Sequence, residues 1–406
     1  MRLRALAATS VLAAGLVMLP TAPAWAGCAN VGMGDLKPAE LPKDDSGNWV
    51  LSRFGLNRLP TGLDGRGVTV AVLDSGVQSS HPALSGRLTS NGRDFLSSGG
   101  GVPGGEDCRG HGTAVASLIA GKPRDGFRGI APGAKIMPIR VNETIGGDTE
   151  DGRKTDDTKI AAAIDWAVDH GADVINLSFA YLNGDAEPEK HAVFAAAVRR
   201  AVEKDVVVVA AVGNDEKATD SFPANLPDVI GVAAIRDDGV LWGNSTHGAF
   251  VDISAPGGGK EGVLVAWPGG GYTQHAGTSF ATPIVAGTAA LLKQLHPDWK
   301  AAQFARQLTA TADPSPGGKN SKEYGAGVVN PVRAVSEVPG FGTAFKNPDA
   351  AVAAPDPVVV AAEERAAVRH TRALWLALGA IALTVIVLLS SSILHNGGRR
   401  HWRPAE

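Results

Sequence analysis

The stretch Gly277-Thr278-Ser279, which runs into a helix of small and apolar residues, could supply a catalytic nucleophile. A serine at a helix N-terminus lies where unpaired backbone N–H groups and the positive end of the helix dipole converge. These groups would stabilise an oxyanion that develops next to the attacking oxygen. Pro283 falls in the opening turns, where a missing N–H costs least. Taken alone, the stretch could equally be an ordinary helix cap.

Three other polar residues stand at the ends of apolar or helical segments. Asp74 follows the continuous apolar run 68–73, and open α/β sheets keep their sites at the carboxyl ends of such strands. Asn214 comes just after a second apolar run, 206–212, and His111 opens a short helical run. A lone histidine before a helix is usually structural, and a lone asparagine after a strand is usually part of a turn. Their joint occurrence in the order Asp, His, Asn, Ser favours nucleophilic catalysis.

These motifs resemble those of the subtilisin-like serine proteases. The order Asp, His, Ser is the order of that family and differs from the chymotrypsin and α/β-hydrolase orders. The resemblance covers about residues 50–335. It is carried by Val72-Leu73-Asp74-Ser75-Gly76, His111-Gly112-Thr113, Ala211-Val212-Gly213-Asn214 and Gly277-Thr278-Ser279.

The resemblance implies a role for each residue of the constellation. Ser279 would attack the scissile carbonyl, and His111 would remove its proton and later protonate the leaving amine. Asp74 would hold the imidazole tautomer and stabilise its positive form. The side-chain amide of Asn214 and the backbone N–H of Ser279 would stabilise the oxyanion.

The same resemblance suggests where a substrate would bind. Ser178, Phe179 and Ala180 would form the edge that pairs with an extended peptide. This triplet departs from the common Ser-Leu-Gly, so the pocket shape does not follow from the resemblance. The primary specificity pocket would be lined by Ala211, Val212 and Gly213.

The composition and the order of segments predict the fold class. The 406 residues, 44% of them apolar, suffice for one large core, and a net charge of −3 does not indicate a nucleic-acid partner. Buried strands alternate with amphipathic helices, which predicts an α/β fold with a doubly wound, mostly parallel sheet and helices on both faces. The peptidase domain is assigned to residues 49–335. Further strands are predicted at 134–141, 173–179, 229–234 and 250–254, helices at 159–170 and 192–204, and a solvated loop at 142–158.

Residues 1–26 have the pattern of a signal peptide. Arg2 and Arg4 give a positive start, 5–19 an apolar run, and Ala24-Trp25-Ala26 a small-x-small cleavage site. A retained N-terminal anchor is the alternative. A lipoprotein cleavage box is disfavoured, because a tryptophan stands where an aliphatic residue is expected.

Export would bring the two cysteines of the chain, Cys28 and Cys108, into an oxidising compartment, where they should pair. By closing the loop between them, this disulfide would stabilise the folded state by about 4–5 kcal/mol in the chain-entropy model. Two unpaired thiols are the alternative. The N-terminal extension, 27–48, is too short for a core of its own, since chains below about 40 residues usually need staples. We therefore expect it to stay attached to the mature enzyme.

The C-terminal region has the pattern of a single membrane anchor. A Pro- and Ala-rich linker, 336–372, leads to the uncharged stretch 373–394, which has about the length that crosses a bilayer. The tail, 395–406, is rich in arginine, so the positive-inside rule places it in the cytoplasm and the catalytic domain outside. A buried core helix is the alternative for 373–394, but too few residues follow to bury it.

This layout resembles the mycosins, which are membrane-anchored proteases of the type VII secretion systems of actinobacteria. The resemblance implies cleavage of proteins exported by that system and association with its membrane complex. A structural scaffold of the complex with incidental proteolysis is one alternative, and a general cell-surface protease is another. No cofactor is expected, and the acidic residues show no ordered spacing of metal ligands.

Overall fold

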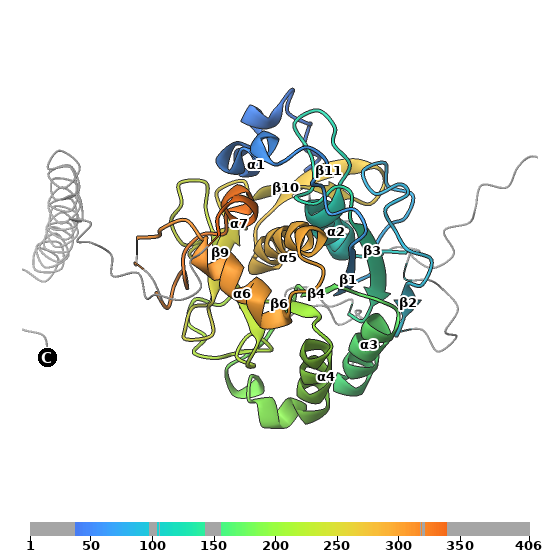
Figure 1. Cartoon of the computed structure of the whole chain (residues 1–406), viewed down its shortest axis with the longest axis vertical. Helices are drawn as coiled ribbons and strands as arrows, with labels where there is room; N and C mark the ends of the chain where they lie inside the picture. Colours follow the sequence, from blue (N-terminus) through green and yellow to red (C-terminus); the bar gives the residue numbers. More distant parts are fainter. Residues whose placement is uncertain are drawn as a thin grey trace, which may run out of the picture. The chain divides into compact units, whose positions relative to one another are not determined.

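The computed structural model describes residues 37–96, 104, 106–142, 156–316, 318 and 321–338. Its centre is a seven-stranded sheet in which all neighbouring strands are parallel (Figure 1). The mostly parallel sheet predicted from the sequence is therefore confirmed. The strand order is β2 (Arg93–Asp94), β3 (Lys135–Arg140), β1 (Thr69–Asp74), β4 (Val174–Leu177), β6 (Val207–Ala211), β8 (Val229–Ile235) and β9 (Ile253–Pro256).

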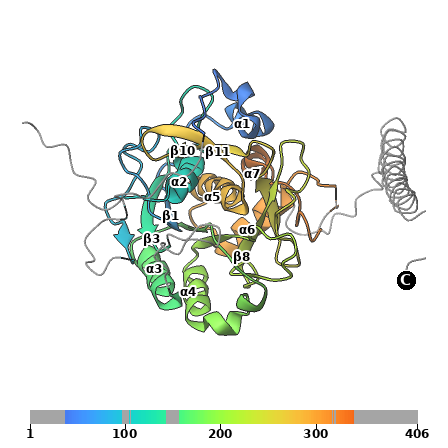
Figure 2. The ribbon, with the colours of Figure 1, turned by 180° about the vertical axis from the view of Figure 1, so that it is seen from behind.

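Helices cover both faces of this sheet, as Figures 1 and 2 show from opposite sides. α2 and α5 pack on one face, and α3 and α4 pack on the other. The helices are α1 (Trp49–Phe54), α2 (His111–Ala120), α3 (Asp157–Asp169), α4 (Ala192–Glu203), α5 (Thr278–Leu295), α6 (Ala301–Ala310) and α7 (Pro331–Ser336).

The alternation of side chains along β1 divides the interior into two cores. Val70 and Val72 pack in the core that contains α2 and α5, whereas Ala71 and Leu73 pack in the core that contains α3 and α4. α5 is buried from its first residue through Lys293, as expected of a helix that is apolar all round. It is the central helix of its layer, and its N-terminus carries Ser279.

Two short antiparallel pairs stand outside the main sheet, and the sequence analysis predicted neither. β10 (Val263–Trp267) pairs with β11 (Gly271–His275), and β5 (Tyr181–Leu182) pairs with β7 (Ser221–Phe222). Two-residue strands are too short to show a period. The β10–β11 hairpin packs partly on α2 and partly on residues that precede α1.

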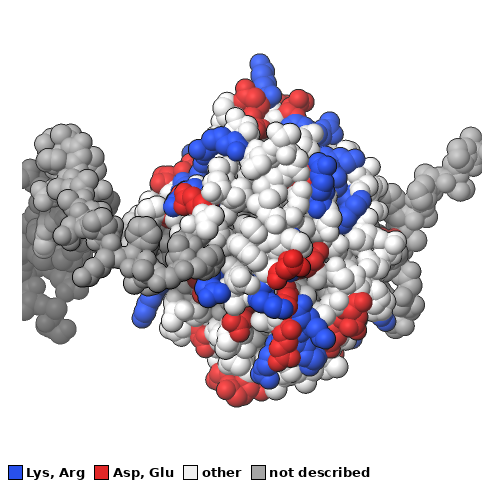
Figure 3. Space-filling view, in the orientation of Figure 1, with Lys and Arg blue, Asp and Glu red and all other residues white. Residues whose placement is uncertain are grey.

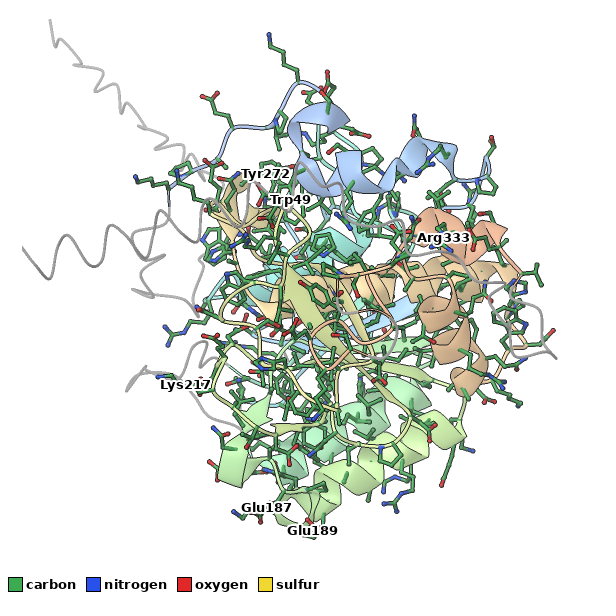
Figure 4. The ribbon with its side chains drawn as sticks, turned by 90° about the vertical axis from the view of Figure 1, so that its left-hand side faces the viewer. Trp49, Glu187, Glu189, Lys217, Tyr272 and Arg333 are labelled. Atoms are coloured by element: carbon green, nitrogen blue, oxygen red, sulfur yellow. The ribbon has the colours of Figure 1, made fainter. Side chains whose placement is uncertain are left out.

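The described part of the N-terminal extension, 37–48, packs against this hairpin. The N–H of Ala39 donates to Tyr272 O at 2.7 Å, and Thr273 Oγ1 donates to Lys37 O at 2.9 Å. The indole of Trp49, at the start of α1, donates to Gly262 O at 2.9 Å. Trp49 and Tyr272 are both labelled in Figure 4. Residues 37–48 are thus part of the folded domain.

Several predicted features lie outside the described residues. They are the signal peptide 1–26, Cys28, most of the solvated loop 142–158, the linker from residue 339 on, the span 373–394 and the tail 395–406. Within the described ranges, no helix is both long and apolar enough to cross a membrane.

Charged side chains of both signs are mixed on the face that Figure 3 shows. Blue and red residues alternate around uncharged surface, and no field of one sign covers this face. This distribution agrees with the small net charge of −3.

Candidate active site

Asp74 and His111 form a buried hydrogen-bonded pair at the carboxyl end of the sheet. Asp74 is the last residue of β1, and His111 is the first residue of α2. The distance from His111 Nδ1 to Asp74 Oδ1 is 2.8 Å, and the two residues are 6% and 4% exposed. A carboxylate can only accept, so Nδ1 carries the proton and Nε2 is the nitrogen that can act as a base.

The first turn of α2 packs closely against the backbone that follows β1, because Gly112 has no side chain. A Cβ on Gly112 would lie 2.0 Å from Gly76 O, a distance that no side chain tolerates. The glycine after the catalytic histidine is therefore required for packing, and the His-Gly-Thr motif reflects this contact.

Ser279 is the second residue of α5 and is 8% exposed. The position that a Cβ on Gly277 would take is 3.3 Å from Ser279 Oγ and 3.5 Å from Asn214 Nδ2. The hydroxyl and the amide nitrogen therefore face the same point in space. The ring of Phe280 lies 5.2 Å from the ring of His111, which brings the N-termini of α5 and α2 together.

Thr278 fixes the orientation of the Asn214 amide. The backbone N–H and the hydroxyl of Thr278 both donate to Asn214 Oδ1, each at 2.9 Å. With its oxygen held in this way, the exposed amide presents its NH2 group as a donor. Thr278 belongs to the Gly-Thr-Ser motif, but nothing in the sequence indicates this orienting role.

Ser178, predicted at the substrate-binding edge, holds the backbone of the nucleophile. Its hydroxyl donates to Ser279 O at 2.9 Å and accepts from Asn176 Nδ2 at 2.8 Å. Asn176 is fully buried within β4, and the sequence carried no signal for its role. Phe179 and Ala180 follow and are partly exposed, and their contact with substrate stays a prediction.

The predicted pocket residues Ala211, Val212 and Gly213 lie between the sheet and Asn214. Ala211 ends β6, and Val212 is fully buried in the core of α3 and α4. The N–H of Gly213 donates to Thr278 Oγ1 at 3.2 Å. Gly213 has a φ of 100° and packs tightly against Leu182. Substrate binding by these three residues likewise stays a prediction.

A chain of stacked and tilted rings runs from the β10–β11 hairpin to His111. The ring of Trp267 stacks on His275 at 4.7 Å, and His275 lies 5.3 Å from Phe280. A Cβ on Gly110 would lie 2.5 Å from the indole of Trp267, so this ring packs directly on the turn that precedes α2. The hairpin thus packs against the turn before His111 and against Phe280.

The charges around the two histidines give them opposite pKa shifts. Burial alone lowers the pKa of His111, but the charge and hydrogen bond of Asp74 and the charge of Asp107 outweigh it, so this pKa is raised above 6.5. Burial, together with the charge of His111, lowers the pKa of His275 to about 4. His275 is therefore neutral at neutral pH.

The geometry suits acyl transfer by a serine nucleophile. His111 is oriented and charge-stabilised by Asp74, and Ser279 lies at a helix N-terminus beside the amide donor of Asn214. Within the described ranges, no group of three or more His, Cys, Asp or Glu side chains is arranged to hold a metal ion.

The similarity of this chain to known proteins agrees with the chemistry that the site geometry suggests. Residues 65–327 match the model of the Subtilase family. The chain belongs to the subtilase family, and it is a serine endopeptidase of the subtilisin type.

Curated relatives include alkaline bacterial proteases. Subtilisin BL from Lederbergia lenta is 39% identical over 270 residues, which are 66% of this chain and 91% of the relative. M-protease from Shouchella clausii (strain KSM-K16) is 37% identical over 270 residues, which are 66% of this chain. The match spans 64% of the length of M-protease.

Similar solved structures include mycosin proteases. The MycP3 protease from the type VII (ESX-3) secretion system is 32% identical with a TM-score of 0.61, covering 74% of this chain and 92% of that one. MycP1 with its N-terminal propeptide removed is 30% identical with a TM-score of 0.61, covering 72% and 98%. The resemblance to mycosins is thus confirmed.

Proposed function

We propose that this chain is a membrane-anchored, extracytoplasmic serine endopeptidase that cleaves proteins exported by a type VII secretion system. The observation that carries the proposal is the convergence of Asp74, His111, Asn214 and Ser279 in a chain similar to MycP3 and MycP1. The catalytic groups supply the chemistry, and the similarity supplies the secretion context. Association with the membrane complex of that system is part of the proposal.

The sequence pattern supports the membrane location. The signal-peptide pattern of 1–26, the uncharged stretch 373–394 and the arginine-rich end together favour one anchor with an external catalytic domain. The linker 336–372 would separate that domain from the bilayer.

The N-terminal extension is proposed to remain on the mature enzyme through a Cys28–Cys108 disulfide. The contacts of residues 37–48 with the hairpin support this, and none of the described cysteines is a free thiol. The alternative is that the extension is a removable propeptide. The N-terminal segment of MycP1 is called a propeptide.

Terminal peptide mapping of secreted proteins tests the proposed substrate class. Strains carrying the wild type, Ser279→Ala or a deletion are compared. We expect exported proteins to show new termini in the wild type that are absent in the Ser279→Ala strain. Unchanged termini would refute the proposed substrates. Restored secretion by Ser279→Ala would instead show a scaffold role.

A further inference from the structure

A buried carboxylate outside the triad, Asp107, accepts hydrogen bonds from four residues. Its Oδ1 accepts from Ser75 Oγ at 2.8 Å and from the N–H groups of Gly110 at 2.8 Å and Arg109 at 3.1 Å. Its Oδ2 accepts from the N–H of Thr113 at 2.8 Å and from Thr113 Oγ1 at 2.6 Å. We propose that Asp107 is a positioning residue for peptide hydrolysis, which holds the turn of the catalytic histidine against the catalytic aspartate.

Asp107 and Ser75 together cap the helix that carries the catalytic histidine. α2 receives no side-chain hydrogen bond from its own N-cap residue. Its second and third residues, Gly112 and Thr113, donate their N–H groups to Ser75 Oγ at 3.0 Å and to Asp107 Oδ2. The first N–H groups of a helix have no acceptor within it, and the helix dipole favours a negative charge there. The two side chains therefore fix the position of the first turn of α2.

Ser75 connects this cap to the catalytic aspartate. Its backbone N–H donates to Asp74 Oδ1 at 2.7 Å, the same oxygen that His111 Nδ1 contacts. Its hydroxyl accepts from Gly112 and donates to Asp107. One residue thus joins the two carboxylates, and a shift of Asp107 would move both partners of the catalytic pair.

Asp107 also acts through its charge. Burial raises the pKa of Asp107, and the charge of Asp74 adds to this, whereas the hydrogen bonds from Thr113 and Ser75 lower it. Among the residues that the structure describes, the titratable groups that interact with His111 are Asp74 from β1, Asp107 from the loop before α2 and His275 from β11. Phe280 of α5 is uncharged, and His275 is neutral at neutral pH. The charges of Asp74 and Asp107 both favour the protonated imidazole of His111.

The Asp107→Asn variant separates positioning from a purely structural role. We expect kcat on a peptide substrate to fall about 10-fold with KM within about 2-fold, because the histidine is displaced rather than the substrate site. The acid limb of the kcat/KM profile should move down by about one pH unit, because loss of a negative charge disfavours the imidazolium. A merely structural carboxylate would lower the melting temperature and leave that limb in place.

Asp252→Asn is the matched control. Asp252 is a partly buried carboxylate that accepts from a backbone N–H, that of Gly231 at 2.8 Å, and burial raises its pKa as it does that of Asp107. Its replacement should lower thermal stability and leave the acid limb unmoved. If Asp107→Asn folds and the acid limb of its kcat/KM profile matches that of the wild type, the proposal is overturned. The comparison requires an active wild type, so failure of the protease assignment itself would be seen first, as absence of hydrolysis.

If Asp107→Asn does not fold, the Ser75→Ala variant tests whether this hydrogen-bond network positions His111. This variant keeps both carboxylates but removes the hydroxyl that joins them and leaves the N–H of Gly112 without its acceptor. We expect kcat to fall about 5-fold at nearly constant KM. Wild-type kcat in Ser75→Ala would refute the positioning network.

Discussion

At the scale of residues, the orientation of the Asn214 amide, the expected oxyanion donor, depends on the hydroxyl of a neighbouring threonine. Thr278 holds the oxygen of the Asn214 amide and so aims its NH2 group. We predict that Thr278→Val lowers kcat about 10-fold with little change in KM, because the amide acts mainly in the transition state. Initial rates on a peptide substrate measure both constants.

Thr288→Val is the control for this prediction. Thr288 is fully buried in the same helix, and its hydroxyl donates to Ile284 O at 2.8 Å, away from the amide. Both variants lose a buried hydroxyl, but only Thr278→Val should change kcat. Equal kcat values in the two variants would contradict the role of Thr278.

The protonation of His111 sets the pH dependence of the wild type. Catalysis needs the neutral imidazole, and the pKa of His111 is raised, so activity is present above this pKa and is lost as the pH falls through it. We predict an acid limb of kcat/KM centred above 6.5, the ordinary value of an imidazole. A profile from about pH 5 to pH 9 tests this. An acid limb below 6.5 would contradict the charge arrangement described for the site.

The residues to which we assign catalysis could be found from the sequence, whereas the residues that support them could not. Asp74, His111 and Ser279 stand in local motifs at strand and helix ends, and these motifs are visible without a fold. Asn176 contacts the hydroxyl of Ser178, which in turn holds Ser279 from 101 residues earlier in the chain. Asp107 has local partners but also contacts Ser75, 32 residues before it, so only tertiary packing completes both sets of contacts. No local pattern marks such residues.

At the scale of elements, the strands and helices of the main layers were predictable because each has a clear period or a continuous apolar run. α4 was expected at 192–204 and is found at Ala192–Glu203. The β10–β11 hairpin was missed, because β11 combines exposed and buried positions without strict alternation. This hairpin nevertheless packs against the turn before His111, so an unpredicted element supports the site.

The pairing of the N-terminal extension with β11 is testable by removing one donor. Ala39→Pro deletes the N–H that donates to Tyr272 O. We predict a loss of about 1 kcal/mol, or about 2–4 °C in melting temperature for a domain of this size. Glu40→Pro, at an exposed neighbouring position, is the control and should cost less. Equal melting temperatures of Ala39→Pro and the wild type would show that the pairing contributes nothing.

At the scale of the whole molecule, charge and hydropathy near the two ends of the sequence are the basis of the membrane topology that we predict. A signal peptide followed by one span with an arginine-rich tail predicts an external domain and an internal C-terminus. Protease added to intact spheroplasts should digest the catalytic domain and leave a tag after Glu406 protected. A tag that is digested from outside would reverse the orientation.

The N-terminal extension is either a permanent part of the enzyme or a propeptide that is removed, and its contribution to stability can be measured. Residues 37–48 pack on the hairpin beside the active site, and a Cys28–Cys108 bridge would keep the extension attached even if its backbone were cut. Cys28→Ser should therefore lower stability by about 2–5 kcal/mol, as loss of a long-loop disulfide does. Thermal unfolding with and without reductant measures this.

Terminal sequencing tests the same model independently. Gly27 should be the first residue of both the wild type and Ser279→Ala, because the signal peptide is removed by another enzyme and the extension remains. Self-cleavage requires Ser279, so a propeptide would be absent from the wild type only. A wild type that begins near Trp49 and lacks the extension under non-reducing conditions would show that the segment is cut off and released, despite its contacts with Tyr272 and Thr273.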